Sequence, residues 1–524
     1  MKPAIRRGAL IVAACVLAAG ASAHAATFRF ADQGDVMSMD PYMLNESLLL
    51  GFMGNVYEGL TGRGKGLETA PELATDWKQT APTVWRFNLR KGVKFHDGSP
   101  FTADDVIFSY ERARGDGSDV KSYVALIREI RKIDATTIDI ITTEPFPILP
   151  QTVSQWYILS KSWCEKNNTL RPVDVRKGTE NYASNHANGT GPFALKSREP
   201  GVKTVLVPNT NWWGKAEHNV TEAVFTPIAN DATRVAALIS GEIDMMQPVP
   251  LQDVPRVQAA ANLKVIQGPE LRTIFLGMDQ KRDELLYSNI KGRNPFKDRR
   301  VRQAFYQAID IDAIRSRIMR NAATPTALMV APAIRGFAPA LNKRLAHDPE
   351  AAKKLLADAG YPTGFEVGMN CPNDRYVNDA EICQAVASML AKVGIKVNLV
   401  AEPKALFFPK VLRRDTSFYL LGFTPLESHN ALFALMATPG EGGQGQFNFG
   451  AYSNPKLDAL TKQIASEIDQ TRRNAMIAEA FRLHQDDIGH IPLHQQMLTW
   501  GLRKTVDVVQ LPNSFNYLRS VTVK

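Results

Sequence analysis

The sequence has few cysteines and lacks the motifs that mark the common enzyme classes. Only 4 of its 524 residues are cysteines, and no Cys-x-x-Cys pair occurs, so the usual zinc-ribbon and dithiol redox sites have no support. A Gly-x-Ser-x-Gly elbow, a Walker loop, a His-Glu-x-x-His helix and a Gly-x-Gly-x-x-Gly turn after a strand are also missing. We therefore predict that the protein is not an enzyme and has no catalytic residue, cofactor or metal site.

Long apolar runs are missing after the first 20 residues, so no later segment is long enough to cross a bilayer. The apolar run Ala9–Ala19 follows a basic start and precedes Ala23-His24-Ala25, which has the small-x-small pattern of a cleavage site. We predict that residues 1–26 are a signal peptide and that the protein acts in the periplasm without a lipid anchor. The run is too short for a transmembrane anchor, and acylation at Cys15 would leave about half of a normal apolar region.

Neither sign of charge dominates the chain. Lys and Arg number 62 against 53 Asp and Glu, a net charge of +9, and removal of the signal peptide with its three cations leaves +6. The densest basic run, Lys297–Arg302, is typical of a helix start in solvent. Because no basic module is interleaved with aromatic residues, we expect no nucleic-acid partner.

Three cysteines, Cys164, Cys371 and Cys383, would remain after export to an oxidising compartment. Cys371 and Cys383 are close enough in sequence to form a disulfide across a strand-loop-helix connection, but three buried thiols fit the sequence equally well. Possible metal ligands near the C-terminus are His484, Asp486, Asp487, His490 and His494. Pro492 prevents a regular helical pair there, so we interpret these side chains as packing.

Strand and helix patterns are mixed along the whole chain. Alternating apolar residues predict strands at Phe28–Ala31, Trp85–Leu89, Thr137–Thr142, Thr204–Val207, Leu263–Ile266, Thr273–Met278, Glu366–Met369 and Lys396–Val400. Helical spacing predicts helices at Asp104–Arg114, Ala232–Ile239, Arg299–Ala308, Asp348–Asp358, Asn378–Ala391 and Leu457–Ile464. This mixture predicts an α/β protein of several domains.

The most specific segment is Trp85–Arg112, WRFNLRKGVKFHDGSPFTADDVIFSYER. Its pattern predicts a β-hairpin with Val93–Phe95 as second strand, then a turn and a helix capped by Thr102, with Asp105 three residues later. In the tight turn, His96-Asp97 fits a structural hydrogen bond better than acid–base chemistry. The segment resembles the signature of the family 5 solute-binding proteins, which deliver peptides and similar solutes to ABC transporters.

Further segments resemble the same family, in the family's order. They are Pro71–Ala74 with Trp77, Gly189–Phe193, Asn209–Gly214, Arg234–Asp244, Phe296–Asp312, Asp348–Pro362 and Gly450–Asp458. The resemblance covers essentially the whole mature chain. It implies an α/β, two-lobe periplasmic binding protein (Venus flytrap, type II) with an additional inserted domain.

The implied domains follow from this resemblance. Lobe I would comprise residues 27–66, 190–275 and 498–524, the inserted small domain residues 67–189, and lobe II residues 276–497. The ligand would lie between the lobes. The implied partners are a small peptide or peptide-like solute and the permease subunits of an ABC transporter in the inner membrane, and we expect the protein to be a monomer.

Two charged residues are the main candidates for binding a peptide's ends. Peptide-binding relatives contribute an Arg from a loop that resembles Cys371–Tyr376, so Arg375 is implied as the partner of a ligand carboxylate. For the ammonium, those relatives have an Asp soon after a strand that ends Gly-Trp. Here the strand ends Gly422-Phe423 and that Asp is missing. Either Glu427 replaces it at a shifted position, or the ligand has no α-ammonium.

Other candidates follow from their positions in the resembling segments. The remaining predicted ligand-binding residues are Ser38, Met39, Asn188, Gly189, Phe423, Phe447 and Asn448. The family has a glycine-rich crossing between its lobes at this point, and glycine near Gly189 would permit the backbone dihedrals that a hinge needs. We interpret Trp212 and Trp213 as packing residues. The leading hypothesis is peptide capture for an ABC importer. The alternatives are another cargo on the same fold (an opine, glutathione, a nickel chelate or haem) and an exported hydrolase, which the missing nucleophile motifs disfavour.

Overall fold

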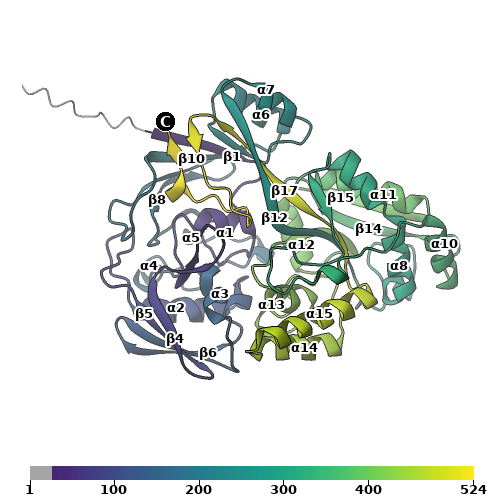
Figure 1. Cartoon of the computed structure of the whole chain (residues 1–524), viewed down its shortest axis with the longest axis horizontal. Helices are drawn as coiled ribbons and strands as arrows, with labels where there is room; N and C mark the ends of the chain where they lie inside the picture. Colours follow the sequence, from purple (N-terminus) through teal and green to yellow (C-terminus); the bar gives the residue numbers. More distant parts are fainter. Residues whose placement is uncertain (1–25) are drawn as a thin grey trace, which may run out of the picture.

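The computed structural model describes residues 26–524 (Figure 1). The predicted signal peptide therefore lies outside the described residues except for its last residue, Ala26, which begins strand β1 (Ala26–Asp32). Among the described helices, none is both long and apolar enough to cross a membrane. The protein is a mixed α/β structure, as predicted, with the N-terminal residues on one side of Figure 1 and the green, later part of the chain on the other.

One large sheet runs through the molecule in the order β15-β14-β16-β12-β17-β11-β1-β10-β9-β8, with β13 paired to β17. Its strands besides β1 are β8 (Phe193–Glu199), β9 (Lys203–Pro208), β10 (Val220–Pro227), β11 (Met245–Gln247), β12 (Leu263–Met278), β13 (Ala323–Pro325), β14 (Phe365–Pro372), β15 (Ile395–Glu402), β16 (Phe418–Phe423) and β17 (Ile491–Arg503). The long strands β12 and β17 pair antiparallel along most of their length and connect the two sides of the molecule (Figure 1).

Strand β12 corrects one prediction. Leu263–Ile266 and Thr273–Met278 are the two ends of this single strand, not separate strands. Its pairing with β17 shifts between Pro269 and Thr273, so residues 270–272 form a bulge opposite one residue, Gln496. The polar residues in this bulge interrupt the apolar alternation, which explains why the pattern divided the strand in two.

A four-stranded antiparallel sheet of β4 (Ala74–Ala81), β5 (Val84–Leu89), β7 (Thr137–Thr142) and β6 (Ile127–Asp134) lies within residues 67–189. The predicted hairpin is wrong, because β5 pairs with β4 and β7. Lys94 forms only an isolated bridge with Pro100. The capped helix is confirmed, since Thr102 and Asp105 form a capping box at the start of α2 (Ala103–Arg114). The domain boundaries themselves stay a prediction.

All six predicted helices are present, with ends that agree to within a few residues. The longer helices are α1 (Ser47–Met53), α2, α6 (Asp231–Ser240), α8 (Arg299–Ala308), α10 (Pro349–Asp358), α11 (Asp379–Ala391), α12 (Lys404–Leu412), α14 (Pro455–Ser466) and α15 (Gln470–Asp487). Short elements are α3 (Leu149–Thr152), α4 (Lys161–Lys166), α5 (Tyr182–Asn185), α7 (Val254–Ala259), α9 (Ile311–Ala313), α13 (Ser428–Ala431), β2 (Thr61–Arg63), β3 (Thr69–Pro71), β18 (Val506–Asp507) and β19 (Thr522–Val523). Helix α8 packs Phe305 against Phe296, Phe365 and Phe418, which anchors it to the sheet.

The signature segment acts as scaffold. The backbone N–H of His96 donates to the carbonyl of Gly189 (2.9 Å), and its ring Nε2 lies 3.0 Å from the carbonyl oxygen of Gly191. The N–H of Asp97 donates to Oδ1 of Asn188 (3.0 Å). The turn is therefore hydrogen-bonded to residues 188–191. This agrees with the structural role expected for His96-Asp97.

Candidate functional site

The candidate site lies where the carboxyl ends of parallel strands from both sides of the molecule face one another. Strand β1 is parallel to β10 and β11, and β14 is parallel to β15 and β16. The chain segments that follow β1, β11, β14 and β16 supply residues to two neighbouring cavities. Ligands of open α/β sheets bind at this end of the strands, so the topology places a binding cleft here.

The two cavities differ in character. We call the first the hinge chamber; it is lined by Asp32, Gln247 and Thr499 and by the β12 bulge residues Glu270 and Arg272. We call the second the aromatic chamber; its lining includes Tyr123, Tyr376, Phe408, Phe423 and Phe447. Ser47, Arg272 and Arg375 line both. The cleft therefore has a polar part beside the long strands and an aromatic part further out, with guanidinium groups between them.

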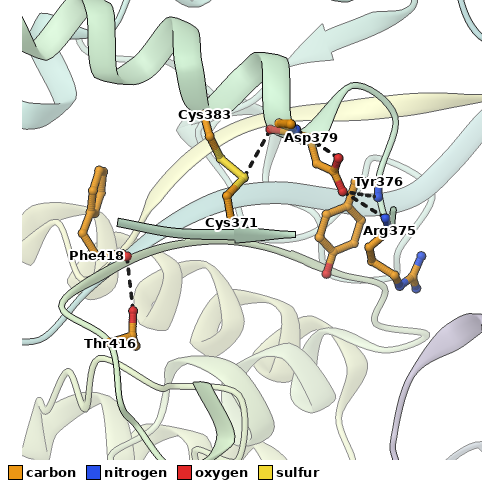
Figure 2. Close-up of a disulfide and its surroundings, with 8 residues drawn as sticks. Cys371, Arg375, Tyr376, Asp379, Cys383, Thr416 and Phe418 are labelled. Carbon is orange, nitrogen blue, oxygen red and sulfur yellow. Dashed lines mark hydrogen bonds between the residues drawn. A yellow bond between two sulfur atoms is a disulfide. The ribbon is translucent and has the colours of Figure 1, made fainter. Parts of the chain in front are cut away.

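A cross-linked loop positions Arg375. Cys371 at the end of β14 and Cys383 in α11 form a disulfide, with their Cα atoms 6.6 Å apart. The Asp379 carboxylate accepts hydrogen bonds from the backbone N–H groups of Arg375 (3.0 Å) and Tyr376 (2.9 Å). In Figure 2 the Arg375 side chain points away from the disulfide. The disulfide settles the question the sequence left open for these two cysteines, whereas Cys164 is a buried free thiol.

Glu46 is the partner of Arg375 across the cleft. Its carboxylate caps α1 by accepting from the N–H groups of Leu48 (3.1 Å) and Leu49 (2.8 Å). It also forms an ion pair with Arg375 and lies 3.9 Å from Nζ of Lys404. The three charged side chains are at most 9% exposed. Burial alone would raise the pKa of Glu46, but Arg375, Lys404 and the hydrogen bonds from the N–H groups of Leu49 and Leu48 together outweigh burial and lower it to about 2.

This depressed pKa predicts an acid-sensitive contact. The pKa of Glu46 falls from an ordinary 4.5 to about 2 on folding, so its stabilising contribution is complete above pH 4.5 and is lost as the pH falls towards 2. A shift of this size corresponds to about 3 kcal/mol. We expect the difference in free energy of unfolding between wild type and Glu46→Gln, measured in urea, to shrink between pH 5 and pH 3.

A matched control for this prediction is Glu350→Gln. The Glu350 side chain is 82% exposed on α10 and pairs only with a neighbouring lysine, so its replacement should change stability by less than about 0.5 kcal/mol at every pH. A wild-type advantage over Glu46→Gln that stays constant from pH 5 to pH 3 would contradict the assignment. Sequence reasoning missed Glu46, because nothing local distinguishes it from any other acidic residue that precedes a helix.

The bulge of β12 carries a second buried pair that the sequence did not reveal. Oε1 of Glu270 accepts from Nε of Arg272 at 2.8 Å and lies 2.7 Å from its terminal nitrogen. Both side chains are almost completely buried. Within residues 26–524, the other oxygen, Oε2, has no hydrogen-bond partner. The only sequence signal is two opposite charges, Glu270 and Arg272, close to the apolar end of the strand.

Three predicted site residues meet in the cleft. Arg375 lines both chambers, and Phe423 and Phe447 line the aromatic chamber with their ring centroids 5.1 Å apart. Glu427 instead lines a separate cavity beside His429 and lies near Arg63, Arg335 and Arg473. Burial raises the pKa of Glu427 above its ordinary value, and the three cations offset only part of this increase. An ammonium group there would meet three positive charges, so the surroundings disfavour the replacement proposed from the sequence.

The other predicted residues are buried and bonded within the protein. Ser38 accepts from the N–H of Asp40 (3.0 Å), and the N–H of Met39 donates to the carbonyl of Ser184 (2.9 Å). Asn448 donates to the carbonyls of Ala437 (2.9 Å) and Tyr452 (2.8 Å). These residues do not line either chamber described above. They shape the loops around the cleft.

Asn188 and Gly189 accept hydrogen bonds from the backbone of the signature turn at Asp97 and His96. The reason given from the sequence for Gly189 is wrong, because its φ is not positive. A Cβ atom there would lie 1.9 Å from the carbonyl oxygen of Val56. Glycine is therefore required by close packing of two backbones, not by hinge dihedrals.

The remaining candidates, two of the C-terminal histidines and the tryptophan pair, make contacts within the protein. Nε2 of His484 lies 2.9 Å from Nδ1 of His490, and both rings are buried. No group of three or more possible metal ligands is found among the residues that the structure describes. Trp212 and Trp213 each donate from Nε1 to the buried carboxylate of Glu58 at 2.9 Å.

Comparison with known proteins agrees with this architecture. The model of the bacterial extracellular solute-binding proteins, family 5 (middle region), matches residues 68–443. Periplasmic murein peptide-binding protein MppA of Escherichia coli (strain K12) is 23% identical over 474 residues, 84% of this chain and 82% of that protein. Glutathione-binding protein GsiB of Shigella dysenteriae serotype 1 (strain Sd197) is 26% identical over 368 residues, 70% and 67% of the two chains.

A solved structure confirms the fold. The ABC transporter-associated periplasmic binding protein DppA from Helicobacter pylori, in complex with the peptide STSA, superimposes with a TM-score of 0.84. The match covers 95% of this chain and 98% of that one, at 24% sequence identity. The two-lobe, type II periplasmic binding-protein fold implied by the resemblance is therefore confirmed.

Proposed function

Because the chain belongs to the bacterial extracellular solute-binding proteins of family 5, we propose that it captures a peptide or peptide-like solute in the periplasm and delivers it to an ABC permease in the inner membrane. Relatives named as peptide- or glutathione-binding, and a peptide-bound neighbour associated with an ABC transporter, support this proposal. The protein acts as a monomeric binding component without catalysis and needs no nucleic acid or cofactor.

The observation that carries the proposal is the position of Arg375. Its guanidinium is buried between the two chambers, on a loop fixed by the disulfide and by Asp379. A planar guanidinium binds a carboxylate through two parallel hydrogen bonds. Nearby, Nζ of Lys404 has no hydrogen-bond partner within residues 26–524. A ligand carboxylate placed here would meet two cations, Arg375 and Lys404, that both lie beside Glu46.

Binding and closure are coupled through this cluster. Arg375 follows β14 and Lys404 begins α12, both in the green part of the chain, whereas Glu46 precedes α1 on the other side (Figure 1). A solute that interacts with both sides favours the closed arrangement, because it adds interactions that the open form lacks. The side chains of Phe423 and Phe447 would pack against apolar parts of the solute.

The test is to identify what the protein binds. Protein exported by its own leader and purified from a periplasmic extract should release a peptide when denatured and analysed by mass spectrometry, and its intact mass should show loss of residues 1–26. After unfolding and refolding without ligand, alanine peptides or glutathione should raise the melting temperature, by an amount corresponding to about 3 kcal/mol at 100 times Kd. Stabilisation only by an opine, nickel chelate or haem, or cleavage of the peptides, would contradict the proposal.

A further inference from the structure

We propose that Glu270 binds the cationic group of the solute, so that the hinge chamber holds an ammonium group while Arg375 holds the carboxylate. This inference rests on the proposed function and deepens it, because it names the recognised chemistry as a zwitterion. Peptide-binding relatives are expected to hold the ammonium with an Asp after the strand that here ends Gly422-Phe423, and this chain lacks that Asp. The proposal gives its role to Glu270 on strand β12.

Glu270 has only one of its two carboxylate oxygens paired, although its side chain is fully buried. Its side chain is 0% exposed, and both contacts with Arg272 involve Oε1. Oε2 is buried without a partner from residues 26–524, yet the residue lines the hinge chamber. Buried carboxylate oxygens almost always accept hydrogen bonds, because an unpaired one loses its hydration without compensation. An orphaned oxygen beside a cavity therefore points to a donor supplied from outside the chain.

The neighbouring side chains present acceptors as well. Nε2 of Gln247 donates to Oδ2 of Asp32 at 3.2 Å, which orients the amide and leaves its oxygen free. Oε1 of Gln247 and Oε1 of Gln496 are likewise buried without a partner among the described residues, and both residues line the chamber. An ammonium group has three donors and no acceptor. Apart from Nε of Arg375, which is ion-paired with Glu46, the buried atoms of this lining that have no hydrogen-bond partner among residues 26–524 are all acceptors, and an ammonium group matches them.

The β12 bulge explains how this arrangement arises. Three residues, 270–272, lie opposite the single residue Gln496 of β17. Glu270 and Arg272 are two positions apart, so they share one face of the strand, and the bulge leaves them without a regular partner other than Gln496. Both line the chamber, as does Gln496 of the partner strand. Because both strands pass between the two sides of the molecule, the ammonium would bind at the hinge.

The cleft presents charges of both signs. The acids Asp32, Glu46 and Glu270 and the cations Arg272 and Arg375 line the two chambers, and Lys404 lies beside Glu46. A solute with one cation and one anion can pair with a buried group of opposite sign at each end, whereas a buried charge left unpaired is costly.

The proposal is tested by removing either the charge of Glu270 or the charge of the ligand. Calorimetry would compare alanine peptides of two to five residues with their N-acetyl forms. We expect Glu270→Gln to weaken the best free-amine peptide at least tenfold and its N-acetyl form less than twofold. The wild type should also prefer the free amine at least tenfold. Gln247→Met, which leaves the pair between Glu270 and Arg272 intact, should weaken only the free-amine peptide, by about three- to fivefold.

Each other outcome has a defined meaning. If wild type binds the peptides and Glu270→Gln changes both forms by less than twofold, the role of Glu270 is refuted while the proposed function stands. Equal losses for free and acetylated peptides would show a structural role and also refute it. A selective loss in Glu427→Gln instead would move the cation site to that residue. If wild type binds no alanine peptide, the proposed peptide function itself fails.

Discussion

Replacement of Arg375 by methionine is expected to weaken binding of the best alanine peptide by about 100-fold. The guanidinium is buried and cannot be replaced by water once the cleft is closed, and truncating one partner of a buried, hydrogen-bonded charge pair costs at least about 2 kcal/mol. Calorimetry should show that the wild type prefers a free carboxylate over the C-terminal amide and that Arg375→Met has lost this preference. Arg375→Lys should lie between the two, because it keeps the charge without the planar fork.

Two further variants separate binding from folding in this experiment. Arg315→Met removes a surface arginine that pairs with Asp312, and it should leave affinity unchanged. Arg375→Met alone strands Glu46 beside a single cation, whereas the double variant Glu46→Gln/Arg375→Met removes both charges. The double variant should recover stability but not affinity. If it recovers affinity as well, Arg375 acts on the fold and does not hold the ligand carboxylate.

Replacement of Arg112 by methionine is expected to lower the free energy of unfolding by about 3–5 kcal/mol, the cost of leaving a buried charge unpaired. Arg112 in α2 binds Asp40 through two hydrogen bonds of 2.9 and 2.6 Å, and both side chains are 0% exposed. This pair fastens the segment that leads to Glu46 onto the region of residues 67–189. Urea unfolding followed by circular dichroism would measure the change.

The same helix offers a matched control for this prediction. Arg114 lies two residues further along α2 and has a 55% exposed side chain, so Arg114→Met should cost less than about 0.5 kcal/mol. The double variant Asp40→Asn/Arg112→Met should recover a large part of the loss, since it leaves no unpaired charge. A small effect of Arg112→Met, comparable to that of Arg114→Met, would show that water or local rearrangement compensates Asp40.

Local patterns predicted local structure well. The helix predicted at Arg299–Ala308 has the same ends as α8, and the helix start predicted at Thr102, with Asp105 three residues later, is a capping box. These features depend on residues within one or two turns, so they are readable from sequence. Pairing between strands is not local. The predicted hairpin after β5 and the division of β12 both failed because they depend on which distant strand lies alongside.

The candidate site shows the same division between local and distant information. Arg375, Phe423 and Phe447 were found through the resemblance and do line the cleft. Glu46 and Glu270 were missed because their significance depends on partners or cavities formed by residues far away in the chain. Glu427 is placed among arginines that no local pattern could have indicated.

The sequence by itself determined the class of the protein. Its mixed strand and helix patterns indicated an α/β chain, and its ordered motifs indicated a two-lobe solute-binding protein, because such motifs record local turns, caps and strand ends. The tertiary structure alone decided which charges meet. Glu46 reaches Arg375 from more than 300 residues away, and the β12 bulge leaves an oxygen of Glu270 unpaired in the hinge chamber. Charge pairing and desolvation depend on distance in space, which strand order and closure of the cleft set and which sequence separation does not.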